Sequence, residues 1–256
     1  MKVFRALRRR LIVQKQLRSY FLYALGEIIL VVVGILIALA IDNRAEQRTL
    51  DRKEQTYLLG LNKEFQTSRK KLIQLIAINR QNYENAQRIV GFIDQPSSLP
   101  SEQVFSELLF NTLNYDIAYN PNNSLLSEMI NSGSLKDLSN PELRRQLTNW
   151  IATLDDIVRQ EQDLDRQREN VLDLFRSDTY SIRTILDYTD VTQVELGLSP
   201  KNTPINNLPL LQSTWFENNL LLFILSSQAT ESSHYAPLLE DVDSILALLK
   251  QELHAR

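Results

Sequence analysis

An uninterrupted apolar run near the N-terminus constrains this chain more than any other feature. Residues 20–41 read YFLYALGEIILVVVGILIALAI, and Glu27 is the one Asp, Glu, Lys or Arg among them. At a rise of about 1.5 Å per residue, such a helix is long enough to cross a hydrocarbon core of about 30 Å. A core helix of a soluble protein would normally carry a polar stripe. We therefore predict a transmembrane helix over 20–41.

The charges on either side of this run predict its orientation. Residues 1–20 carry seven cationic side chains and no acid, whereas residues 42–256 carry 21 Lys and Arg against 30 Asp and Glu. Basic segments resist translocation, so the N-terminus is expected in the cytoplasm and the remainder outside it.

The basic arm itself has two interpretations. One is contact with anionic lipid headgroups, and the other is a plain positive-inside anchor. A tethered arm of about 20 residues without a fold makes nucleic acid an improbable partner. The lipid-contact interpretation assigns Arg5, Arg8, Arg9, Arg10, Lys15 and Arg18.

A cleaved signal peptide is the competing interpretation of the same run. Ala38-Leu39-Ala40 has the small-x-small pattern that precedes a signal peptidase cleavage site. A signal sequence has an apolar region of about 7 to 15 residues, however, and this run is longer and contains Glu27. A retained anchor is therefore the favoured interpretation.

One face of the predicted helix combines an acid with small residues. A carboxylate inside a bilayer is unfavourable unless it is protonated, paired, facing water or extended toward the headgroups. Gly34 and Ala38 form a small-xxx-small pair that lets two helices approach closely. We predict self-association along this face, with a channel lined at Glu27 as a minor alternative. The face consists of Glu27, Val31, Gly34, Ala38 and Ile41.

Two stretches resemble a known family. Residues 23–28 (YALGEI) and 30–39 (LVVVGILIAL), followed by Ile41-Asp42-Asn43, are similar to the start of an uncharacterised family of Gram-negative single-pass membrane proteins. Residues 130–135 (INSGSL) and 140–144 (NPELR) resemble a later turn and helix start of that family. Ala40 departs from the family pattern, which commonly has Gln there. The resemblance implies a retained anchor in the inner membrane and a periplasmic helical domain, and it carries no known activity.

The remainder is expected to be all-α, because six Gly and eight Pro leave few obligatory turns and helix-favouring residues dominate. We expect a transmembrane helix continuing into a long stalk helix, kinked near Gly60, and then an extracytoplasmic helical bundle. The predicted divisions are a cytoplasmic arm (1–19), a transmembrane helix (20–41), a stalk helix (42–94) and a bundle packing on the stalk (95–256).

A long helix should begin at Pro141 with Asn140 as its N-cap. Its apolar residues recur at steps of four and three from Leu143 to Phe175, which predicts antiparallel packing on the stalk or pairing with a second copy. Glu161 and Arg168 occupy two positions of this seam. We expect the seam to open to water there, and a role in setting the register of helix packing is the alternative. Farther on, residues 215–225 predict a buried helix that is too short to span a bilayer, and residues 238–253 predict a closing amphipathic helix.

No motif in the sequence predicts catalysis. There is no Cys, and the chain has no P-loop, dinucleotide or nucleophile-elbow motif. His234 near Glu231 lacks the second such pair of a di-iron bundle. We expect no enzyme activity, no metal and no cofactor.

Two functions remain open: an envelope structural or interaction protein that self-associates and engages a protein partner, and an extracytoplasmic ligand-binding sensor or accessory subunit. The sensor would need a second chain for signalling, because only about 20 residues are expected in the cytoplasm.

Overall fold

The computed structural model describes residues 17–254, and all of its regular structure in that range is helical, which confirms the all-α prediction. Short 3-10 turns connect several of the helices, and a π-helical turn, η5 (Glu231–Tyr235), joins the last two. The α-helices are α2 (Leu17–Asp94), α3 (Glu102–Leu113), α4 (Ser124–Asn131), α5 (Pro141–Leu172), α6 (Ile182–Tyr188), α7 (Val191–Val194), α8 (Thr214–Thr230) and α9 (Ala236–His254).

The chain divides into two compact units, 1–56 and 57–256, with the division falling inside α2. In the first unit, the described residues 17–56 belong to α2 alone. Their first part is the apolar run, and residues 42–56 are polar and largely exposed. Local bonds, such as Gln47 Nε2 to Asp51 Oδ1 at 3.0 Å, support the helix in this polar stretch.

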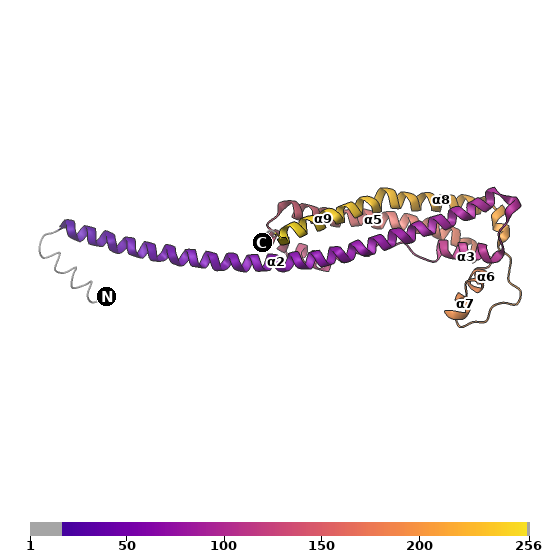
Figure 1. The fold of residues 1–256 in the computed structure, drawn as a ribbon, viewed down its shortest axis with the longest axis horizontal. Coiled ribbons are helices and arrows are strands. Elements are labelled where there is room, and N and C mark those ends of the chain that lie inside the picture. Colours follow the sequence, from indigo (N-terminus) through magenta and orange to yellow (C-terminus); the bar gives the residue numbers. More distant parts are fainter. Residues whose placement is uncertain (1–16, 255–256) are drawn as a thin grey trace. The chain divides into compact units, whose positions relative to one another are not determined.

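The second unit is built on three long helices, namely residues 57–94 of α2, then α5, and the continuous run of α8, η5 and α9 (Figure 1). Arg69 and Arg80 of α2 bond to Asp243 and Glu231, respectively, so α2 is antiparallel to the α8–α9 run. Asn140 bonds to Glu252 and Glu161 to Tyr235, so α5 is antiparallel to the same run.

Residues 57–94 of α2 therefore run parallel to α5. The prediction that α5 packs antiparallel on the stalk is wrong. The reason is that the intervening stretch, which includes α3 and α4, returns the chain before α5 begins.

The core of the second unit lies between these helices. The rings of Phe65 on α2 and Trp150 on α5 have centroids 5.3 Å apart, and both side chains are buried. The start of α5 is as predicted: the Asn140 side chain accepts hydrogen bonds from the backbone N–H groups of Glu142 and Leu143. The apolar seam of α5 faces this core, from Leu143 to Phe175.

The last two predicted helices are both present, as α8 and α9, and they are joined without a loop. The π turn of η5 continues α8 directly into α9, and Pro237, which has no backbone N–H to donate, lies shortly after that turn. The buried positions explain the π turn. They follow steps of four and three along α8 (Phe216, Leu220, Phe223, Ser227, Thr230) and again from the last residue of η5 into α9 (Tyr235, Leu238, Val242, Ile245, Leu249). The step from Thr230 to Tyr235 is five, so η5 absorbs one extra residue and keeps both helices facing the core.

Candidate functional site

The apolar segment of α2 is the first candidate site. None of its most apolar 18-residue window is buried, and the mean hydropathy of that window is 2.9. The five residues of the predicted packing face are all exposed and follow one another at steps of four and three residues on this helix. A Cβ added at Gly34 would have no atom of this chain within 4 Å. The face is therefore open, and its role in helix packing remains a prediction.

The predicted lipid-contact residues lie almost entirely outside the described part of the chain. Arg5, Arg8, Arg9, Arg10 and Lys15 fall in residues 1–16, and Arg18 lies in the first turn of α2, where side chains are not described.

The second candidate site is a buried carboxylate in the other unit. Glu161, on α5, is 7% exposed, so the prediction that the α5 seam opens to water at this position is wrong. Its Oε1 accepts a 2.8 Å hydrogen bond from the backbone N–H of Tyr119 and a 2.5 Å bond from the hydroxyl of Tyr235. These donors replace the water that a charged side chain would otherwise need. Arg168, the other polar seam residue, is partly buried, and its Nε donates to the carbonyl of Leu113 at the end of α3.

Tyr119 belongs to residues 114–123, the segment between α3 and α4 that we call the strap. On its α2 side, Ser68 Oγ donates to the carbonyl of Asn122 at 3.1 Å and accepts from the Asn122 N–H at 2.8 Å. Lys71 Nζ donates to the carbonyl of Asn120 at 2.9 Å and to Asn122 Oδ1 at 2.6 Å. The Tyr119 hydroxyl donates to the carbonyl of Ser68 at 3.1 Å. Side chains of α2 and α5 thus hold the strap from both sides.

Burial determines the electrostatics of this cluster. Desolvation raises the pKa of Glu161 above its usual value, and the negative charge of Asp116 on the strap adds to that effect, while the two hydrogen bonds oppose it. Burial also raises the pKa of Tyr235, and the neighbouring Glu161 raises it further. Burial likewise raises the pKa of Tyr119. The cluster therefore favours neutral side chains.

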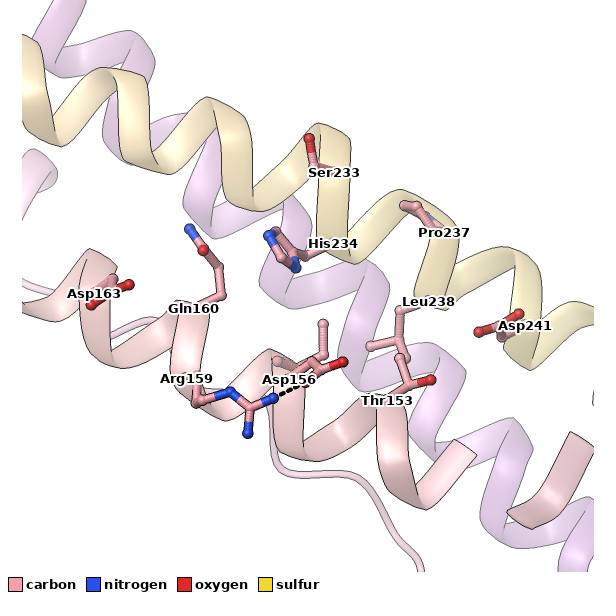
Figure 2. Close-up of a pocket in the computed structure, with 11 residues that line it drawn as sticks. Thr153, Asp156, Arg159, Gln160, Asp163, Ser233, His234, Pro237, Leu238 and Asp241 are labelled. Carbon is pink, nitrogen blue, oxygen red and sulfur yellow. Dashed lines mark hydrogen bonds and ion pairs between the residues drawn. The ribbon is translucent and has the colours of Figure 1, made fainter. Parts of the chain in front are cut away.

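A groove of about 510 Å³ lies between α5 and the η5–α9 region (Figure 2). Ile157 and Leu238 supply its apolar lining, and Asp156 in its wall is paired with Arg159. His234 and Gln160 also line it. Among residues 17–254, no group of three or more His, Cys, Asp or Glu side chains is arranged to hold a metal ion. The groove offers hydrogen-bonding groups at an open surface.

Glu231 and His234 do not form a ligand pair in this arrangement. Glu231 bonds instead to Arg80 of α2, with Nε to Oε1 at 3.1 Å, while His234 lines the groove.

The Glu161 cluster is the site that the sequence did not predict. Its three members are Glu161 on α5, Tyr119 on the strap and Tyr235 in η5. The two tyrosines lie 42 and 74 residues from Glu161 in the sequence. The one local signal is an acid at a position of a largely apolar seam, and that signal is equally typical of a solvated position.

Comparison with known proteins gives one match. A family model described as "Family of unknown function (DUF6090)" matches residues 27–174, which include most of the apolar segment, the strap and α5. No curated protein and no solved structure matches the chain.

Proposed function

The chain belongs to DUF6090, a family of unknown function, and we propose that it is a single-pass membrane protein of the cell envelope with a structural or interaction role. In this proposal, residues 20–41 cross the inner membrane, the N-terminus is cytoplasmic and the second unit lies in the periplasm. The chain catalyses no reaction, associates with further copies through the face that contains Gly34, and engages an envelope protein through the second unit.

The exposure of the apolar segment is the observation that carries this proposal. Large apolar side chains point outward on every side of α2 between Phe21 and Ile41, each at least 44% exposed. A helix that is apolar all round needs a surrounding apolar medium, which is either a protein core or lipid. Nothing within the described chain covers this segment. Lipid supplies that cover, and a second copy supplies it along the face that contains Gly34.

The flanks of the segment support the same topology. Tyr20 and Tyr23 stand at the N-terminal end, where aromatic residues favour the membrane interface, and the basic arm precedes them. At the other end, α2 becomes polar from Asp42 onward. The helix therefore changes character over a length that matches a bilayer.

Membrane extraction tests the anchor. The full chain, expressed in a Gram-negative host, should stay in the membrane pellet after alkaline carbonate washing and should retain its N-terminus. Replacing Leu30 and Val33 together by Arg should release most of it, because each Arg near the helix centre opposes insertion by about 3 kcal/mol. The matched control is Leu50→Arg, an exposed apolar residue on the polar part of α2, which should remain in the pellet.

Recovery of the unmodified chain in the carbonate supernatant would refute the anchor, as would a mature protein that begins at Ile41. Protease added to spheroplasts tests the orientation separately: the second unit should be digested in intact spheroplasts. Protection that is lost only after lysis would place that unit in the cytoplasm instead.

A further inference from the structure

The strap covers an aromatic cluster in the second unit. The ring of Tyr119 lies 6.3 Å from that of Trp150 at an interplanar angle of 90°, and Trp150 in turn packs on Phe65. Ile117 of the strap is also buried. The strap thus contributes both an aromatic ring and an aliphatic side chain to the cover of a core that would otherwise meet water.

Two neighbouring parts of the strap are held by different chemistry. Ser68, which does not titrate, and the cationic Lys71 bind residues 120–122 through four hydrogen bonds. The backbone of Tyr119, in the middle of the strap, is bound by Glu161, a titratable and buried side chain. A change in the charge of Glu161 therefore acts on the middle of the strap and leaves residues 120–122 tied to α2.

Within residues 17–254, no ion pair involves Glu161, so no cation of that range compensates a charge on it. The groups that influence the charge of Glu161 are the Tyr235 hydroxyl from η5, the Tyr119 N–H from the strap and the acidic side chain of Asp116, also on the strap. Lys71 of α2 is engaged with the strap at Asn120, and on η5 Glu231 is paired with Arg80 and His234 lines the groove.

The hydrogen bonds to Glu161 also leave room for a proton. Both donors use the same oxygen, Oε1. A protonated carboxyl group keeps one oxygen as an acceptor for these two bonds and carries the proton on Oε2. Protonation therefore removes the buried charge without removing either bond.

We propose that Glu161 is a proton-controlled latch of the strap, which closes over the Trp150 cluster when Glu161 is protonated and loosens when Glu161 ionises. In the open state, water reaches the carboxylate and stabilises its charge, so ionisation favours opening. The raised pKa of Glu161 in the closed state agrees with this direction.

Hydrogen exchange on the full chain in detergent micelles tests the latch between pH 5 and pH 8.5. After correction for intrinsic exchange, protection of the strap amides at Ile117 and Tyr119 should fall as pH rises, by about tenfold for each pKa unit that separates the closed from the open state. Glu161→Gln should abolish that dependence and keep the strap protected at every pH. The matched control is Asp163→Asn, an exposed acid on the same helix, which should retain the wild-type profile.

A second variant and a second readout keep the test decisive if Glu161→Gln does not fold. The negative charge of Asp116 raises the pKa of Glu161 in the closed state, so Asp116→Asn should bring that pKa closer to the pKa of the open state. The fall in protection should therefore become smaller, and its midpoint should move to lower pH. In a Trp215→Phe background, Trp150 is the remaining tryptophan, and its quenching by acrylamide should rise with pH. Wild-type protection that does not change with pH would overturn the proposal, as would a Glu161→Gln variant with the wild-type slope.

Discussion

The carboxylate of Glu64, on α2, accepts a 2.8 Å hydrogen bond from the backbone N–H of Leu125, in the first turn of α4. Its other oxygen lies 3.4 Å from the nitrogen of Leu126. The first N–H groups of a helix have no partner within the helix, and the local N-cap residue, Asn123, makes no side-chain capping bond. An acid from a neighbouring helix therefore caps α4, and its charge also complements the helix dipole.

Removing this cap should destabilise the second unit. We expect Glu64→Ala to lower the free energy of unfolding by about 1–2 kcal/mol, and Glu64→Gln to lower it by less, because the amide oxygen remains an acceptor. Urea unfolding followed by circular dichroism measures both. Glu84→Ala, at an exposed position of the same helix, should change the stability by less than about 0.5 kcal/mol. Equal effects at positions 64 and 84 would contradict the capping role.

Gly60 should be energetically coupled to Leu125. The helix α2 continues through Gly60, and a Cβ added there would lie 2.4 Å from Cδ2 of Leu125. Gly60→Ala gains helix propensity of about 1 kcal/mol but forces the Leu125 side chain to move. We therefore expect Gly60→Ala to change the free energy of unfolding clearly more favourably in a Leu125→Ala background than in the wild type. A double-mutant cycle with zero coupling would show that the close approach has no energetic consequence.

The sequence predicts elements well where the signal is local. The start of α5 follows from Asn140 and Pro141, because caps and prolines act within a few residues. The apolar run of α2 is likewise a local property. The burial of Glu161 is different, because its donors belong to Tyr119 and Tyr235, and no pattern in α5 contains them.

Helix direction and the π turn needed tertiary information as well. An apolar seam on α5 predicts a buried face but not the direction of its neighbour, and the return of the chain before Pro141 makes α5 parallel to the second half of α2. The seam after Thr230 is interrupted by a step of five residues. Such a step is typical of a break between helices, and only the continuing contacts with α5 favour a single run.

Stability should fall with rising pH because of Glu161. Its pKa is raised in the folded state, so the folded chain holds this proton more tightly than the unfolded chain does. The contribution is fully present below the unfolded pKa, about 4.3, and is lost as pH rises through the folded pKa. The free energy of unfolding of the Glu161→Gln variant, measured in urea, should therefore increase relative to that of the wild type as pH rises from 4 to 7.5. A constant difference across that range would show that Glu161 has the same pKa in both states.

The extra residue in η5 should be dispensable. Deleting exposed Ser232 shortens the step from Thr230 to Tyr235 to four residues, which an ordinary α-helix accommodates on one face. We expect this deletion to change the free energy of unfolding by about 1 kcal/mol or less, since π turns are poorly favoured on their own. Deleting exposed Ser244 of α9 should cost several times more, because it turns Ile245 and Leu249 away from the core. Thermal unfolding compares the two deletions, and equal losses would contradict the register argument.

Self-association through the membrane segment should depend on Gly34 and not on Gly26. Both glycines lie in the apolar part of α2, and a Cβ at either would meet no atom of this chain within 4 Å. Only Gly34 belongs to the face shared with Ala38, where a small residue allows close helix packing. The chain has no native Cys, so one Cys introduced at Asp42 can report contacts between copies by disulfide formation in membranes. Gly34→Leu should reduce the cross-linked fraction several-fold and Gly26→Leu should leave it unchanged, whereas the same fraction in both variants would exclude this face as the contact.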